Sequence, residues 1–331
     1  MNSNKPAAAA AAAAAAVAAT VILITGCGAS STETVGAAPM AENTPMVDKE
    51  NWPKATPDRG LAKGLSLPLE AYMQTYQETV ALDQASRKLQ KECMAEYGLP
   101  IELPLAGTTP PLSDNDANME RRYGLTNREA AVLYGYGLPE ALTSQVRQKE
   151  PELTDEQVQV LTGHSKPTDS TAPGADLAAE PAPKFYKGKE IHKGGCSGWA
   201  EGKLKPPRPE DLAFVSELNG NSFTESMQAP AVKRALADWS QCMKTEGYAA
   251  ATPFEAAEIA PHTEGGMASK EEIAVALAEI DCKGKSDLVA VWFAEETRIQ
   301  KAQIAEYQDK LSDIRTENSS AAAAANAEAA S

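Results

Sequence analysis

The sequence is poor in aromatic residues, in histidine and in basic charge. Aromatic residues make up 5% of its 331 residues, it holds three histidines, and 31 lysines and arginines stand against 46 acidic residues, for a net charge of −15. A chain of this charge repels nucleic acid and anionic lipid head groups, so we expect no nucleic-acid partner. It holds no Cys-x-x-Cys pair, which argues against a thioredoxin-like redox role. Beyond the N-terminal segment, no stretch is apolar enough to cross a membrane.

The most apolar stretch lies near the N-terminus and ends at a cysteine. Lys5 precedes an alanine run, which leads into Val21-Ile22-Leu23-Ile24-Thr25-Gly26-Cys27. A charged start, an apolar stretch and a small-residue cleavage site are typical of a secretory signal, and a small residue directly before cysteine is typical of a bacterial lipobox. The sequence therefore predicts a signal peptide at residues 1–26 and acyl chains on Cys27, which would anchor the protein to the extracytoplasmic face of the cell membrane. An uncleaved transmembrane anchor is the alternative.

The rest of the chain divides into a tether, a helical domain and a tail. Residues 27–65 lack apolar periodicity and predict a flexible tether, whereas residues 318–331 are alanine-rich and predict a disordered tail. Residues 66–317 hold helical stripes and no convincing strand, so the fold class is mostly α. We expect a first helix of roughly thirty residues that ends near Tyr97. Capping signals at Thr154 and Ser269 mark the starts of later helices.

A weak internal repeat suggests how the later cysteines pair. Cys93-Met94 and Cys242-Met243 each lie near the predicted end of a helix, with glycine five residues after the cysteine. Each pair is followed by one more cysteine, Cys196 or Cys282, with glycine two residues on. The repeat predicts two related halves, at about 66–218 and 219–317. Four cysteines in an exported chain indicate two structural disulfides with three possible pairings, of which the repeat favours Cys93–Cys196 and Cys242–Cys282.

These motifs together resemble a group of proteins. The lipobox, Cys93-Met94, Gly194-Gly195-Cys196, Trp239 to Met243, and Asp281-Cys282-Lys283 before a long final helix are similar to uncharacterised secreted lipoproteins of actinomycetes with repeated Cys-Met helix ends. The group has no established activity. The resemblance therefore implies a location and disulfide bridging, not a reaction.

Three patterns suggest chemistry, but each departs from the motif it resembles. Gly195-Cys196-Ser197-Gly198-Trp199 lacks the last glycine and the preceding strand of a nucleophile elbow. Asp114-Asn115-Asp116-Ala117-Asn118 opens like a calcium loop, but Met119 and Leu125 stand where glycine and glutamate belong. His192 lies near Cys196, yet a bridged cysteine is no thiolate ligand, and His164 and His262 are far away in the sequence. We therefore assign no catalytic, cofactor-binding or metal-binding residue.

Two further features are explained by ordinary protein structure without a binding role. Tyr123, Tyr134 and Tyr136 alternate with glycines, and at this density aromatic residues more often fix a loop to a small core than line a groove. The polar face of Glu295–Lys310 is more typical of a solvated helix than of a coiled-coil contact.

The sequence favours a non-enzymatic envelope lipoprotein that binds a protein or a small ligand. One alternative is an envelope enzyme with an acidic catalytic pair that sequence cannot assign, which a deep pocket holding two carboxylates of raised pKa would support. Another is an accessory subunit of an envelope transporter that docks through its final helix. An exposed apolar strip along residues 288–314 would support that alternative.

Overall fold

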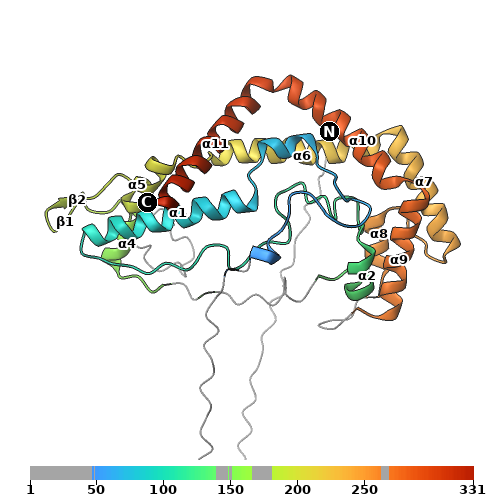
Figure 1. Cartoon of the computed structure of the whole chain (residues 1–331), viewed down its shortest axis with the longest axis horizontal. Helices are drawn as coiled ribbons and strands as arrows, with labels where there is room; N and C mark the ends of the chain where they lie inside the picture. The colour runs from blue at the N-terminus through green and yellow to red at the C-terminus, as the bar shows by residue number, and fades with distance from the viewer. Residues whose placement is uncertain (1–46, 48, 139–147, 149–150, 166–180, 262–267) are drawn as a thin grey trace, which may run out of the picture. The chain divides into compact units, whose positions relative to one another are not determined.

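The structure is a computed structural model that describes residues 47, 49–138, 148, 151–165, 181–261 and 268–331. The predicted leader, Cys27, most of the predicted tether and His262 lie outside these residues. Pro45–Ser331 forms one compact unit. Its described part is mostly α, which confirms the predicted fold class (Figure 1). In this part, no helix combines the length and the apolarity that a membrane span needs.

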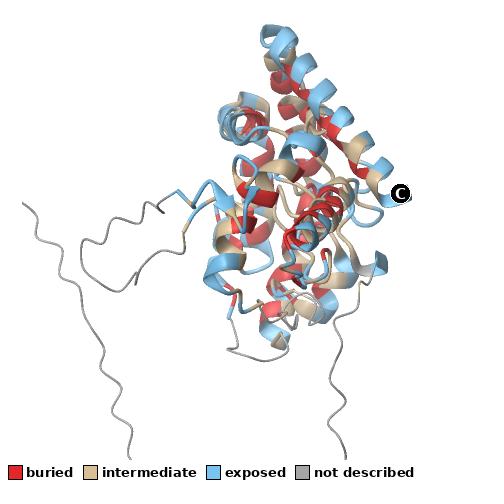
Figure 2. Ribbon diagram, turned by 90° about the vertical axis from the view of Figure 1, so that its left-hand side faces the viewer, coloured by how far each residue is buried: buried red, intermediate tan, exposed pale blue. Residues whose placement is uncertain are grey.

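The helices follow one another along the chain. They are η1 (Lys49–Asn51), η2 (Pro68–Tyr72), α1 (Tyr76–Glu96), α2 (Arg128–Tyr134), α4 (Asp155–Thr162), α5 (Gly195–Leu204), α6 (Pro209–Gln228), α7 (Pro230–Thr245), α8 (Pro253–Ile259), α9 (Lys270–Lys285), α10 (Leu288–Glu306) and α11 (Gln308–Ala330). Figure 2 shows buried residues on the helix faces that meet and exposed residues on the outer faces. The largest buried cluster gathers around Trp239 and Trp292, between α7, α9 and α10.

One small hairpin corrects the expectation of no strand. Strands β1 (Phe185–Tyr186) and β2 (Lys189–Glu190) pair antiparallel, with Phe185 opposite Glu190 and Tyr186 opposite Lys189. Strands of two residues are too short to leave a period-two pattern in the sequence.

The single long first helix was a wrong prediction. A 3-10 turn, η2, ends at Tyr72, and α1 starts only at Tyr76. Thr75 stops the helix from extending backwards, because its hydroxyl accepts a hydrogen bond from the Glu78 amide while the Glu78 side chain accepts one from the Thr75 amide. Such a capping box fixes the first residue of a helix.

The disordered C-terminal tail was also a wrong prediction, because α11 continues to Ala330. Ala321 and Ala325 are fully buried in a cluster with Leu82, Leu89 and Leu204, so α11 lies against α1 and α5 (Figure 1). Alanine is the best helix former, and its small side chain lets helices approach closely. The alanine-rich composition therefore builds a packed helix.

The folded unit begins earlier than residue 66. Trp52 packs against Tyr76, Val80 and Ala106, and Ala62 is fully buried. The segment 49–65 is thus part of the fold and not of a tether. It consists mostly of turns, which carry no apolar period.

Both disulfides have the predicted pairing. Cys93–Cys196 joins α1 to α5, and Cys242–Cys282 joins α7 to α9, with Cα atoms 5.7 Å and 5.6 Å apart. The two predicted halves, however, share their cores: Leu311 and Ile314 of α11 pack with Leu69 and Val215, and Tyr123 packs in the cluster of α7, α9 and α10. The bridges thus fasten two places within one compact unit.

Candidate functional site

A hollow of about 330 Å³ opens between the segment before η2 and the loop that leads to α2. One wall comes from residues 50–59, and the other comes from residues 111–120 together with Asn127. The residues that line it are Glu50, Trp52, Pro53, Lys54, Ala55, Pro57, Asp58, Arg59, Pro111, Leu112, Ser113, Asp114, Asn115, Asn118, Met119, Glu120 and Asn127. The volume is in the range of small-molecule sites.

The loop of residues 111–120 contributes Asp114, Asn115 and Asn118 to the polar lining. Asp114 Oδ1 accepts a hydrogen bond of 2.8 Å from the Tyr76 amide, at the start of α1. Burial raises the pKa of the Asp114 carboxyl, and the charge of Glu78 acts in the same direction. Asn115 Oδ1 accepts from the Ala117 amide at 2.8 Å, so the loop is held by its own side chains as well.

Asn118 adopts a left-handed backbone conformation, with φ of 36°. Asparagine tolerates this region better than most residues because its short side chain interacts locally with the backbone. Within the described part of the chain, the side chains of Asn118 and Ser113 have no hydrogen-bond partner. Both line the hollow, so their polar groups are free to meet a ligand.

The apolar lining comes from Trp52 and Leu112. The Trp52 indole donates to the Gly107 carbonyl at 3.1 Å and meets the Tyr76 ring edge-on at 5.2 Å, so the ring is fixed in place. Leu112 is 54% exposed at the rim. The hollow therefore offers a ligand both a rigid aromatic edge and amide and carboxylate groups.

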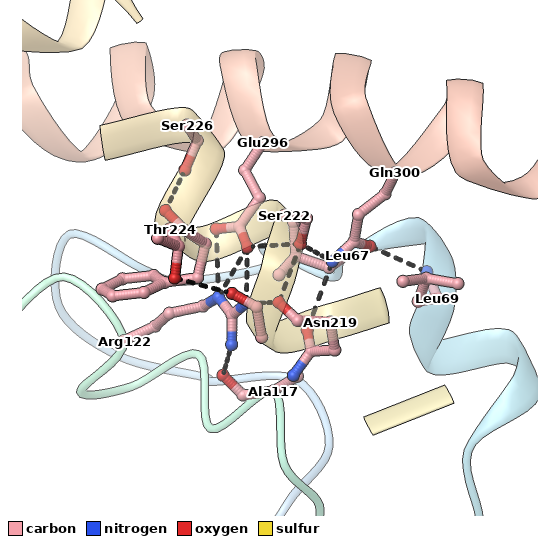
Figure 3. Close-up of polar contacts among 12 residues, drawn as sticks. Leu67, Leu69, Ala117, Arg122, Asn219, Ser222, Thr224, Ser226, Glu296 and Gln300 are labelled. Atoms are coloured by element: carbon pink, nitrogen blue, oxygen red, sulfur yellow. Dashed lines mark hydrogen bonds and ion pairs between the residues drawn. The ribbon is translucent and has the colours of Figure 1, made fainter. Parts of the chain in front are cut away.

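Beneath the loop lies a buried ion pair between Arg122 and Glu296 of α10 (Figure 3). Their side chains are 7% and 0% exposed. The Glu296 carboxylate accepts from the guanidinium at 2.5–3.1 Å, from the Tyr123 hydroxyl at 2.7 Å and from the Ser222 hydroxyl at 2.9 Å. Burial raises the pKa of Tyr123, and the adjacent Glu296 charge adds to this effect. The Tyr123 hydroxyl therefore stays protonated and keeps donating to Glu296.

The same guanidinium holds the backbone of the loop. Arg122 Nη1 donates to the Ala117 carbonyl at 3.2 Å and Nη2 to the Asn219 carbonyl at 2.9 Å, while the Asn219 side chain donates to the Asp116 carbonyl at 3.2 Å (Figure 3). These bonds tie residues 116 and 117 to α6 and α10. The wall of the hollow is therefore fixed from below by charged groups that are themselves paired.

A second buried pair, Glu279 with Lys283, holds the other end of this loop. Both side chains are fully buried. Lys283 donates to Glu279 and, at 2.8 Å, to the Leu125 carbonyl, and Glu279 accepts from the Leu125 amide at 2.9 Å and the Tyr136 hydroxyl at 2.5 Å. Desolvation lowers the pKa of Lys283, against the opposing effect of Glu279. With Tyr123 buried and Tyr136 packed against the core, the interpretation of this tyrosine cluster as core is confirmed for both.

The other sequence candidates lie elsewhere. Cys196 and Ser197 are in the first turn of α5, where Cys196 is bridged. His164 and His192, far apart in the sequence, line a second, more open hollow of about 670 Å³ beside the start of α5. Their spacing in the sequence does not indicate that these two histidines line one hollow. In the described part of the chain, no three His, Cys, Asp or Glu residues are placed to hold a metal ion.

Two features would support the alternative functions: an exposed apolar strip on the final helix, and a pocket that holds two carboxylates of raised pKa. The apolar stripe of the final helix is buried inside the protein: Leu288, Trp292 and Leu311 are fully buried. Glu296 and Gln300 are buried too, so the polar face of Glu295–Lys310 is only partly solvated. Burial raises the pKa of both Asp114 and Glu70, but Glu70 is occupied by the Leu67 amide and the Ser66 hydroxyl and does not line the hollow.

The fold and its hollow define a disulfide-bridged helical domain with a fixed surface cavity. Comparison of the chain with models of protein families, with curated proteins and with solved structures found no match.

Proposed function

We propose that this chain is a lipid-anchored extracytoplasmic binding protein of the cell envelope, and that the hollow beside Asp114–Asn118 receives a small polar ligand. One observation supports the binding proposal. The loop that forms a wall of the hollow is held in place by the buried pair Arg122–Glu296, and the hollow contains polar side chains without a hydrogen-bond partner among the described residues. A site whose polar groups are already positioned loses little entropy when the ligand binds.

The location follows from three features. The first is the leader that ends at Cys27, and the second is the resemblance to secreted actinomycete lipoproteins. The third is the pair of disulfides, since such bridges persist in oxidising compartments and are rare in the cytosol. The buried apolar stripe of α10 and α11 weighs against docking to a transporter through the final helix.

The anchor is tested by Cys27→Ala. We expect the variant to leave the membrane fraction or to accumulate as precursor, because the lipid acceptor is lost. Fractionation of cells followed by immunodetection gives the answer. A variant that stays with the membrane as mature protein would refute the anchor.

The hollow is tested with Asn118→Gly and its control Asp287→Gly. Both positions have a positive φ, at 36° and 52°, so glycine fits either backbone and only Asn118→Gly removes an amide from the hollow. Ligand-observed NMR against a panel of neutral oligosaccharides, short peptides and amino acids measures binding to the wild type and both variants. We expect one ligand class to bind, and its affinity to fall about tenfold in Asn118→Gly only, through loss of a well-placed hydrogen bond.

A second matched pair uses two exposed leucines. Leu112 at the rim is 54% exposed, and Leu105, outside the hollow, is 56% exposed. Leu112→Ala should weaken binding and Leu105→Ala should not. If no ligand class in the panel binds, or if Asn118→Gly and Leu112→Ala both leave the affinity of the bound ligand unchanged, the hollow is not a ligand site.

A further inference from the structure

The basic residues of this acidic protein are concentrated in one segment. Residues 184–208 hold seven lysines and arginines and two glutamates, a net charge of +5. The remaining residues together carry −20, which gives the −15 of the whole chain. The segment forms the β1–β2 hairpin and α5, which lie side by side at one edge of the unit (Figure 1).

Together with Tyr97 of the residue stretch after α1, part of this segment forms a row of three rings with a lysine at each end. Lys189 Nζ lies 4.3 Å from the Tyr97 ring, which meets His192 edge-on at 6.3 Å. His192 stacks on Trp199 at 5.8 Å, and Lys203 Nζ lies 4.2 Å above Trp199. Cation–π contacts of this length hold lysine ammonium groups in place without neutralising them.

The hairpin adds an exposed aromatic ring between lysines. Phe185 is 55% exposed, and Lys184 and Lys187 lie over the Phe185 and Tyr186 rings at 5.6 Å and 5.1 Å. We call the surface formed by Lys184, Phe185, Lys187, Lys189, Lys193 and Lys203 the basic ledge. Lys184 and Lys189 make exposed ion pairs with Glu190 and Glu96, which water and salt screen. In the described part of the chain, Lys187, Lys193 and Lys203 make none.

The first residue of the hairpin turn, Lys187, is unusual for its backbone conformation. Lys187 and Gly188 have φ of 45° and 83°. A two-residue hairpin turn with both angles positive favours Asn, Asp or Gly at its first position, because a longer side chain is strained there. A lysine at the tip therefore carries a conformational cost, and its charge gives a reason for it.

We propose that the basic ledge docks on an anionic lipid bilayer, with the lysines among the head groups and Phe185 entering the interface. An exposed ring flanked by lysines suits a surface that is charged outside and apolar beneath. Each lysine near such a surface contributes to binding, whereas the −20 carried by the rest of the chain is repelled by it. The ledge would thus turn one defined edge of the unit toward the membrane, although the total charge of the chain indicates repulsion.

The experiment is vesicle co-sedimentation of the chain from Gly28 to Ser331, without leader or lipid. This chain retains the compact unit and both disulfides. Vesicles contain either equal parts of phosphatidylglycerol and phosphatidylcholine or phosphatidylcholine alone. We expect binding to the anionic vesicles, lost at high salt because the charges are then screened. Since Cys27 is absent, failure of this test and failure of the proposed lipid anchor are distinguishable.

The double variant Lys187→Glu with Lys193→Glu should lower the affinity for anionic vesicles by more than about tenfold. Its control, Lys233→Glu with Lys301→Glu on α7 and α10, changes the net charge equally and alters exposed lysines outside the ledge. We expect the control to change the affinity by less than about twofold, because the screening length is short.

Lys187→Asn separates binding from folding. Asparagine suits the turn, so the melting temperature should stay or rise, while the affinity falls about fivefold from the loss of one charge. Equal binding to both vesicle types, or equal losses in the ledge and control variants, would overturn the proposal. Strong binding of soluble polyphosphate by the ledge without vesicle binding would overturn it as well, in favour of a soluble polyanion.

Discussion

The buried pair Arg122–Glu296 gives the sharpest prediction about stability. In Glu296→Gln the side chain keeps its shape but loses its charge, and Arg122, only 7% exposed, is left without a counter-ion. Removing one partner of a buried ion pair typically costs about 3–5 kcal/mol. Arg122 keeps its bonds to the Ala117 and Asn219 carbonyls, so we expect about 3 kcal/mol, the lower end of that range.

The reverse change should cost more. In Arg122→Met the Glu296 carboxylate stays fully buried with only the Tyr123 and Ser222 hydroxyls as donors, so we expect about 5 kcal/mol. The double variant Arg122→Met with Glu296→Leu leaves no unpaired charge. Its loss should fall short of the sum of the single losses by at least about 2 kcal/mol, because the two side chains interact directly.

Urea unfolding of the oxidised protein, followed by circular dichroism and extrapolated to water, measures these losses. Glu295→Gln is the matched control: its carboxylate pairs with the exposed Arg298, and a surface pair is worth at most about 1 kcal/mol. A loss below about 1 kcal/mol for Glu296→Gln, or additive losses in the double variant, would refute the view that this pair fixes the loop.

Two further predictions concern α11 and the hollow. Ala325→Asp should destabilise the protein by about 2 kcal/mol or more, because it buries an unpaired carboxylate against α1 and α5, whereas the exposed Ala323→Asp should stay within about 0.5 kcal/mol in the same urea assay. The folded state raises the pKa of Asp114, so it binds that proton more tightly than the unfolded chain, and the stability linked to this proton is lost as pH rises through the raised pKa. Wild-type protein should therefore gain free energy of unfolding relative to Asp114→Asn as pH falls from neutral to about 4, the pKa of an unperturbed aspartate. A gain in the opposite direction would contradict the burial of this carboxyl.

The parts of the fold that sequence predicted correctly are those with local signals. Thr154 and Ser269 cap α4 and α9 as expected, because an N-cap residue and its partner lie within one turn. The disulfide pairing was also predicted correctly, because the repeated Cys-Met helix ends favoured one of the three possible pairings. Segments without an apolar period were not predicted correctly: residues 49–65 fold as turns, and the C-terminal part of α11 offers only alanines to the leucines of α1 and α5.

The candidate site could not be predicted from the sequence for a different reason: its parts are far apart along the chain. Asp114–Asn118 resembles the opening of a calcium loop, but Trp52, which lines the opposite wall of the hollow, lies in the segment that the sequence predicts as a tether. Arg122 is 174 residues from Glu296, and Leu69 is 231 from Gln300, whose side-chain oxygen accepts its amide hydrogen bond. A glutamate on a helix is normally solvated, so its residue type favours the outer face for Glu296, although its spacing from Trp292 and Ile299 places it on the apolar stripe. Only the folded chain shows that it is buried.

The same limit applies to charge. A net charge of −15 predicts repulsion from anionic surfaces only if the charges are evenly spread, because interactions between exposed charges fade over roughly 10 Å. The folded chain places Lys189 and Lys203 at the two ends of one stack around His192, so an anionic surface at that edge meets cations first. The total charge of the chain then affects how the protein is oriented at an anionic surface more than whether it is attracted to that surface. If the proposed docking holds, a single basic edge is enough to decide which side of this acidic chain faces the lipid.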